Sequence, residues 1–230
     1  MNWTNTLFFL VFTYIMLTLF VVGHAGRYVT DPFSWNARSS EFLEKKQLYP
    51  GITLFHWGIL FSLSGHIGGL LIPQSLIDMI GIDGQTHTLI AHWAGLASGL
   101  ALFAGVLLLF TRRLTNRRIR TTSRLSDFVT LFLIVFVAGA GLYNVVFSHF
   151  YILDTIAPWI RGLVTFSPHP ELMTGVPIAY KIHIVSALAL LGFSPFSRLI
   201  HIWSVPFLYP LRRLIVFRRR DMNCPGSLVD

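Results

Sequence analysis

Charged residues are scarce in this chain of 230 residues. They make up 12% of it, about half the share that is usual in soluble domains, whereas 53% of the residues are hydrophobic. This balance argues against an ordinary soluble enzyme and indicates a membrane protein. The formal net charge of +8 would suit a nucleic-acid partner, but the basic residues stand beside apolar runs. In that position they act as topology signals, so no nucleic-acid binding is predicted.

Cysteine is almost absent as well, because Cys224 near the C-terminus is the only one. A single thiol excludes an internal disulfide and a cysteine-ligated cluster within the chain. Acidic residues are missing from the centres of the apolar runs. Asp127 stands at the end of one run, and Asp78 and Asp83 lie between two of them. Any ionisable chemistry inside a membrane must therefore rest on other side chains.

Five apolar runs reach the length of about 20 residues that a helix needs to cross a bilayer. They cover approximately residues 5–25, 51–73, 87–111, 126–149 and 178–203. The first run is preceded by no lysine or arginine, unlike a signal peptide, and we expect a retained helix. The sequence therefore predicts an all-α membrane protein, a bundle of five transmembrane helices over residues 1–216, with a polar cytoplasmic tail over 217–230.

The basic residues predict how the bundle is oriented. One side of the five spans collects 16 of the 18 lysines and arginines, and the other side has only Arg161 and Lys181. By the positive-inside rule the N-terminus is outside and the C-terminus is cytoplasmic. The outer segment 150–177 includes APWIRGLVTF at 157–166, which is too short to span. Its mix of aromatic and apolar residues predicts a helix that lies in the membrane interface.

Histidine is the ionisable residue that the spans do contain. His56, His66 and His183 fall within spans, and His201 falls at the inner end of the fifth. Such residues are costly in a membrane and mark function. Because the second and fifth spans run in opposite directions, His66 is level with His183 and His56 is level with His201. Two histidines at each of two depths match a pair of haems with bis-histidine ligation.

Helical geometry sets further expectations for these histidines. At 1.5 Å per residue, His56 and His66 are about 15 Å apart, and His183 and His201 are about 27 Å apart. The spacing of eighteen residues in the fifth span makes five turns, so His183 and His201 are expected on one helix face. The unequal separations require a tilted helix or a bend near Pro195. The other histidines at span ends or in the outer segment, His24, His149 and His169, are expected to be hydrated.

Glycine is frequent beside the histidines of the second span, at Gly58, Gly65, Gly68 and Gly69. It would let a macrocycle approach the backbone, and it would equally let two helices pack closely. Gly95 and Gly99 form a GxxxG pattern, which we assign to helix packing. A haem-free transporter that uses a histidine relay remains an alternative, disfavoured by the lack of a central aspartate or glutamate in any span.

Four segments resemble the gamma subunit of membrane-bound respiratory nitrate reductase, its cytochrome b. They are GRYVTDPFSWNARSSEFLEKK (26–46), LFHWGIL (54–60), SGHIGG (64–69) and PFSRLIHIWSVP (195–206), and the likeness covers nearly the whole chain. The resemblance implies two haem b groups. His56 and His201 would ligate one near the cytoplasm, and His66 and His183 would ligate the other near the outer face. It also implies quinol oxidation at the outer haem, near His66, Gly65 and Gly69.

The resemblance implies a lysine of the quinol site at the start of the third span, where this chain has His87. A histidine there would hydrogen-bond a quinol oxygen or accept its proton, and an interfacial His87 without a role is an equal alternative. His92 is a weaker candidate. At the cytoplasmic ends of spans, Arg112, Arg113 and Arg198 are candidates for contacts with haem propionates, because arginine binds carboxylates bidentately. Membrane anchoring or partner docking is the preferred interpretation of each.

The resemblance thus implies the quinol-oxidising electron-transfer subunit of a nitrate reductase in the inner (cytoplasmic) membrane of a prokaryote. Electrons from menaquinol or ubiquinol would pass inward through the two haems, and protons would be released outside. The expected cytoplasmic partners are an iron–sulfur beta subunit and a molybdenum-containing alpha subunit that reduces nitrate, since this chain has no nitrate-reducing site. The nearest alternative is a related cytochrome b subunit of another quinone-linked complex, such as a sulfite- or heterodisulfide-reductase-like one.

Overall fold

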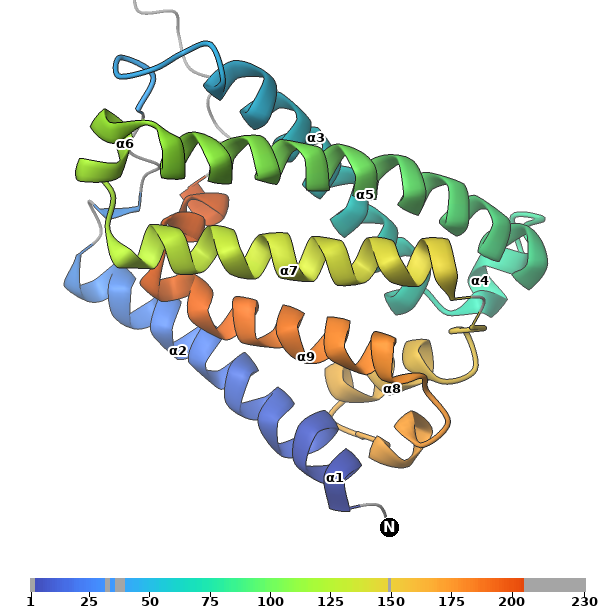
Figure 1. Ribbon diagram of the computed structural model, residues 1–230. Helices are drawn as coiled ribbons and strands as arrows, with labels where there is room; N and C mark the ends of the chain where they lie inside the picture. Colours follow the sequence, from blue (N-terminus) through green and yellow to red (C-terminus); the bar gives the residue numbers. More distant parts are fainter. Residues whose placement is uncertain (1–2, 32–33, 36–39, 149, 205–230) are drawn as a thin grey trace, which may run out of the picture.

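The computed structural model describes residues 3–31, 34–35, 40–148 and 150–204, and within these ranges every regular element is a helix (Figure 1). The predicted tail over 217–230, Cys224 and His149 lie outside the described residues. Five helical segments are long and apolar enough to cross a membrane. They confirm the all-α class and the five predicted spans. The sides on which the two termini lie relative to a membrane stay a prediction.

The spans are built from the following elements. The first comprises α1 (Trp3–Thr6), the π-helix η1 (Leu7–Phe12) and α2 (Thr13–Thr30), and the second comprises α3 (Leu48–His66) and the π-helix η3 (Ile67–Leu71). The third and fourth are α5 (Gly84–Thr115) and α7 (Leu125–Phe147), and the fifth is α9 (Ile178–Phe193) with η5 (Ser194–Phe196). Shorter elements connect them, namely α4 (Gln74–Asp78), α6 (Arg117–Thr121), α8 (Ile156–Val164), η4 (Pro170–Met173) and η6 (Arg198–Ser204).

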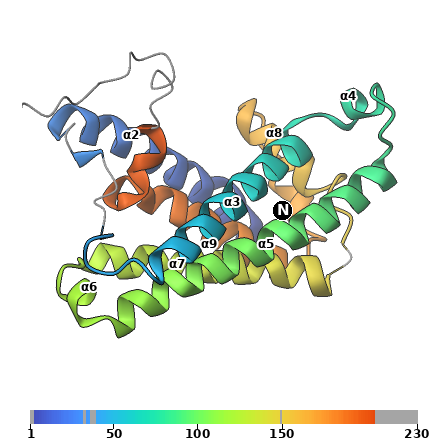
Figure 2. The same ribbon diagram turned by 90° about the horizontal axis from the view of Figure 1, so that it is seen from above.

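The long helices pack in the order α3, α5, α7, α9 and α2 (Figures 1 and 2). Glycine explains the close crossing of α3 and α5. A Cβ at Gly58 would collide with the backbone of Leu102, and one at Gly105 would collide with the backbone of Phe55. Gly58 therefore serves helix packing and not the approach of a macrocycle. The GxxxG glycines also pack as predicted, since Cβ atoms at Gly95 and Gly99 would contact side chains of α7.

The fifth span is interrupted where the sequence predicts a bend. Helix α9 ends at Phe193, η5 forms one tight turn around Pro195, and Ser197 is extended, with φ −121° and ψ −177°. Proline has no N–H to donate and its ring clashes with the preceding turn, so the α-helix cannot continue. The expectation of a continuous helix to residue 203, with His183 and His201 on one face, is therefore wrong. His201 lies on the separate 3₁₀ segment η6.

Two ends of the bundle are distinguished below. The arginine end, at α6 and η6, carries Arg112 and Arg113 of α5 and Arg198 of η6. The α8 end carries α1, α4 and α8 (Figure 1). At the α8 end, Trp159 and its neighbours on α8 pack against Phe9 in a buried cluster, and the Trp159 indole Nε1 donates to the Phe9 carbonyl at 3.0 Å. As predicted, α8 is too short to span, with nine residues.

Candidate functional site

The four histidines of the spans form two facing pairs. The ring centroids of His56 and His201 are 6.2 Å apart with an interplanar angle of 68°, and those of His66 and His183 are 6.1 Å apart at 34°. Each pair joins α3 to the fifth span or its continuation η6, although α3 packs mainly against α5, and α9 packs mainly against α7 and α2. The structure thus brings together the two pairs that the antiparallel topology places at equal depths.

The separation within each pair has a chemical meaning. Two imidazoles that bind one metal ion from opposite sides, with metal–nitrogen bonds of about 2 Å, have ring centroids about 6 Å apart. Both observed separations agree with this distance. A pair of imidazoles is also the axial ligand set of a bis-histidine haem, whose other four ligands belong to the macrocycle. The donor set of each pair therefore fits a haem b.

In all four rings, Nδ1 makes a hydrogen bond to a main-chain carbonyl. The Nδ1 atoms of His56 and His66 bond the carbonyls four residues earlier, Ile52 and Ser62, at 2.8 and 2.6 Å. The Nδ1 of His201 bonds the Arg198 carbonyl at 2.6 Å. A carbonyl only accepts, so Nδ1 must carry the proton and Nε2 carries the lone pair in the neutral ring. This arrangement is typical of metal-binding histidines, whose second nitrogen is held by a main-chain or carboxylate oxygen.

His183 is held from a neighbouring helix. Its Nδ1 donates to the carbonyl of Val137 on α7 at 3.0 Å, whereas the other three rings bond their own helical segment. Gly141, one turn further along α7, makes room for the ring. A Cβ at that position would lie 2.9 Å from His183 Cε1 and 3.2 Å from its Nδ1. The position of the His183 ring thus depends on α7 as well as on α9.

The segment that carries His201 is fixed by two long-range contacts at the arginine end. Arg27 donates from Nη1 to the carbonyls of Pro195 and Ser197, at 2.6 and 2.9 Å. Arg198 pairs with Asp127, with Nε and Nη2 at 2.7 and 2.8 Å from the carboxylate. These bonds join α2 and α7 to the turn after α9. They fix the position of η6 and therefore of His201, which is not part of the continuous helix α9.

Asp127 is the centre of this end of the bundle. Asp127 is 4% exposed, and its carboxylate accepts from Arg113 Nη1 at 2.8 Å, from Arg198 and from the Arg124 backbone N–H at 3.0 Å. Two arginines sharing one buried carboxylate form a paired charge cluster, as buried ions require. The predicted propionate contacts of Arg113 and Arg198 stay predictions, and the structure shows both guanidinium groups bound to Asp127.

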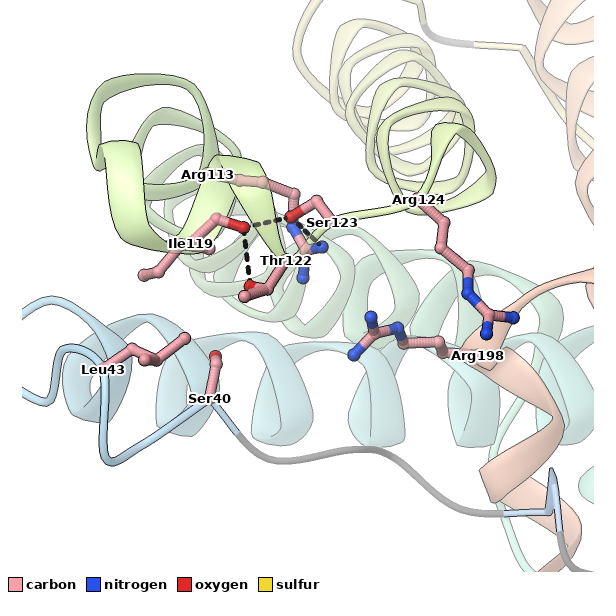
Figure 3. Close-up of a pocket in the computed structure, with 8 residues that line it drawn as sticks. All are labelled: Ser40, Leu43, Arg113, Ile119, Thr122, Ser123, Arg124 and Arg198. Atoms are coloured by element: carbon pink, nitrogen blue, oxygen red, sulfur yellow. Dashed lines mark hydrogen bonds between the residues drawn. The ribbon is translucent and has the colours of Figure 1, made fainter.

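A cavity of about 270 Å³ opens beside this cluster. Figure 3 shows Arg113, Arg124 and Arg198 around it, coming from α5, the start of α7 and η6. Arg112 does not line the cavity. It is buried and binds the Glu44 carboxylate at 2.6 Å and the carbonyls of Ser40 and Glu44, so that it attaches the segment before α3 to α5. Arg112 is therefore a structural anchor.

At the α8 end, the predicted quinol-site residues lie beside one another. His87, at the start of α5, has its Nε2 3.4 Å from the position that a Cβ on Gly69 would take. Its Nδ1 bonds the Gln74 Oε1 at 2.7 Å. Cβ atoms at Gly65 and Gly68 would meet nothing within 4 Å, so the backbone on both sides of His66 borders open space. The structure thus joins His66, Gly65, Gly69 and His87 around one region.

The remaining described histidines have other surroundings. His24 is 8% exposed, with its ring centroid 4.6 Å from that of Phe20 and 6.1 Å from that of Trp35. The expectation that His24 is hydrated is therefore wrong, because an aromatic cluster covers it. His169 is exposed in the segment before η4 and bonds Glu171, as expected for a hydrated residue. His92 is half-buried with its ring against Trp93.

Comparisons with known proteins agree with this arrangement. A family model described as nitrate reductase gamma subunit matches residues 5–220. The chain belongs to the nitrate reductase gamma subunit family. It is 42% identical over 215 residues to the nitrate reductase gamma chain of Bacillus subtilis (strain 168), which covers 92% of this chain and 96% of the relative. It is 34% identical over 228 residues to the respiratory nitrate reductase 1 gamma chain of Escherichia coli (strain K12), covering 96% and 100%.

Membership confirms the resemblance seen in the sequence. The gamma subunits are membrane-anchored cytochrome b subunits of an oxidoreductase complex, and membership implies catalytic and iron–sulfur partner subunits. The five apolar helices agree with a multi-pass membrane protein.

Four residues of the site were not predicted from the sequence, namely Arg27, Gln74, Asp127 and Gly141. Asp127 carried a signal, since it is an acid at a span end between clusters of arginine.

Proposed function

We propose that this gamma subunit holds two b haems and oxidises quinol at the α8 end of the bundle. The observation that carries the proposal is the pair of facing imidazoles at each of two positions, at a separation that fits one metal ion. His66 and His183 hold the haem at the α8 end, and His56 and His201 hold the haem at the arginine end. The haem-free transporter has no comparable support, because its relay would not need paired rings at this distance.

Bound haem supplies reversible one-electron transfer, with a potential that depends on its ligands, their hydrogen bonds and burial. The protein determines where the two haems would lie. The carbonyls of Ile52, Ser62, Val137 and Arg198 hold the four Nδ1 atoms, so each neutral ring would offer Nε2 to a haem iron without loss of a proton. In this proposal electrons would enter near the His66–His183 pair and leave near the His56–His201 pair.

The quinol site lies beside His66, Gly65 and Gly69, with His87 across from Gly69. One quinol leaves as quinone after it gives up two electrons and two protons. The electrons move toward the arginine end and the protons leave at the α8 end. With the arginine end in the cytoplasm, as the positive-inside rule predicts, this separation of charge builds a transmembrane potential.

The arginine end is where the partner subunits bind in this proposal. An iron–sulfur beta subunit receives the electrons there and passes them to a molybdenum-containing alpha subunit, which reduces nitrate. The membrane is the inner, cytoplasmic one of a prokaryote, and the quinol is menaquinol or ubiquinol. Arg113 and Arg198 remain candidates for propionate contacts, next to the cavity that they line.

A reduced-minus-oxidised visible spectrum of the purified protein, with a haem-to-protein ratio, tests the proposal. We expect two b haems per chain. His66→Ala and His183→Ala should each leave one haem and abolish quinol oxidation, because they remove ligands of the same iron. His92→Ala, which removes an imidazole outside the two pairs, should leave two. A well-folded wild-type protein without a haem band would refute the proposal, and so would loss of both haems in His66→Ala.

A further inference from the structure

A chain of side-chain hydrogen bonds joins α4 to the start of α5 at the α8 end. The Gln74 amide nitrogen donates to the Asp78 carboxylate at 2.8 Å and to the Ile82 carbonyl at 3.1 Å. The Gln74 amide oxygen lies 2.7 Å from His87 Nδ1. Gln74 thus contacts three groups with one amide, although it follows Pro73 at the beginning of a helix of only five residues.

These contacts determine which nitrogen of His87 carries the proton. A carboxylate and a carbonyl only accept, so both must face the NH₂ group of Gln74. The amide oxygen then necessarily faces His87. Because this oxygen also only accepts, His87 Nδ1 must be the donor. In the neutral ring the remaining nitrogen, Nε2, is therefore an acceptor with a free lone pair.

The acceptor nitrogen of His87 points toward the proposed quinol site. It lies 3.4 Å from the position of a Cβ on Gly69, in the π-helix η3 that follows His66 directly. A side chain at position 69 would fill the space in front of Nε2. Gly65, near the end of α3, and Gly68, in η3, also border open space. A ligand that reaches this space can therefore meet the lone pair of His87.

We propose that His87 accepts a hydrogen bond from a quinol hydroxyl, and that Gln74 is the positioning residue that fixes this polarity. A quinol carries two hydroxyl donors, whereas a quinone carries only carbonyl acceptors. An acceptor at the site therefore favours the reduced substrate over the oxidised product. This selectivity rests on the proposed function, because it concerns the same site, and it favours release of quinone after oxidation.

Steady-state kinetics of the complete nitrate reductase complex in membranes test this polarity. The substrate is menadiol, and menadione is added as the product inhibitor. The quantity compared is the ratio of the menadione inhibition constant to the menadiol KM. We expect this ratio to fall about 3- to 10-fold in His87→Ala and in Gln74→Leu, the range of one hydrogen bond between neutral groups. The change should lie mainly in KM and the inhibition constant, with kcat less affected.

Two further variants separate polarity from general damage. His87→Lys replaces the acceptor by a group that only donates, so the ratio should fall further than in His87→Ala. His169→Ala removes an exposed imidazole that bonds Glu171 in the segment before η4 and should leave the ratio unchanged. Two b haems per chain in each variant show that the site is otherwise intact.

The possible results distinguish this inference from the function on which it rests. A wild-type complex that does not oxidise menadiol refutes the proposed function itself. Normal oxidation with an unchanged ratio in His87→Ala and Gln74→Leu refutes the inference alone. Should Gln74→Leu fail to accumulate, His87→Lys decides the question, because a ratio equal to the wild-type one in that variant is incompatible with an acceptor at position 87.

Discussion

The dependence of His183 on α7 leads to a specific prediction for Gly141→Ala. The added Cβ would lie 2.9 Å from His183 Cε1, and ordinary van der Waals contact begins at 3.4 Å, so the ring must move by about 0.5 Å. That movement also strains the 3.0 Å bond from Nδ1 to the Val137 carbonyl. Loss of a hydrogen bond that orients a metal-binding histidine typically weakens metal binding about 10- to 100-fold, or about 1.4 to 2.7 kcal/mol.

The substitution should not harm α7 itself, because alanine in a helix is more favourable than glycine by about 0.5 to 1 kcal/mol. The assay is a haem-to-protein ratio with a visible spectrum, followed by haem release under a competing haem-binding protein. We expect the haem of the His66–His183 pair to be lost or released faster, and the other haem to stay. Gly139→Ala is the matched control, since its Cβ would meet Phe103 of α5 at 3.3 Å and not a histidine. Two haems with wild-type release rates in Gly141→Ala would refute the reasoning.

Three other predictions follow from the contacts at the two ends of the bundle. Asp127→Asn leaves two guanidinium groups without their shared carboxylate, so the free energy of unfolding should fall by about 3 kcal/mol. The haem at the arginine end should also bind more weakly. An unchanged Tm in thermal unfolding would contradict this prediction. Burial alone would raise the pKa of the Glu44 carboxyl, but hydrogen bonds from the Gln47 backbone and from Arg112 outweigh it and hold this pKa below 4.5. The Glu44–Arg112 contact therefore stabilises the protein above pH 4.5 and weakens as the pH falls through the lowered pKa, so protection of segment 40–47 from proteolysis should decrease there, and less so in Glu44→Gln. Trp159→Phe keeps an aromatic ring on α8 but loses the bond to the Phe9 carbonyl, and we expect a loss of about 1 kcal/mol in unfolding free energy and no change in haem content.

Much of the architecture could be predicted from the sequence because it depends on local properties. Apolar runs of about 20 residues are long enough to cross a membrane as helices, and a helix satisfies its backbone polar groups within its own segment. The alternation of direction that follows from five spans was enough to pair His66 with His183 and His56 with His201. Pro195 marked the bend, because proline interrupts a helix wherever it stands in the interior.

The tertiary structure alone decided the contacts between residues that are distant in the sequence. Nothing local shows that Val137 and Gly141 set the ring of His183, that Arg27 and Asp127 hold the turn before His201, or that Gly58 packs against α5 and not beside a macrocycle. The sequence shows no recognisable role for Gln74, and only the fold brings its amide oxygen to 2.7 Å from His87 Nδ1. Helix formation follows from hydrogen bonds within a few residues, whereas the orientation of each imidazole depends on which carbonyl, carboxylate or glycine the packing of separate helices brings beside it.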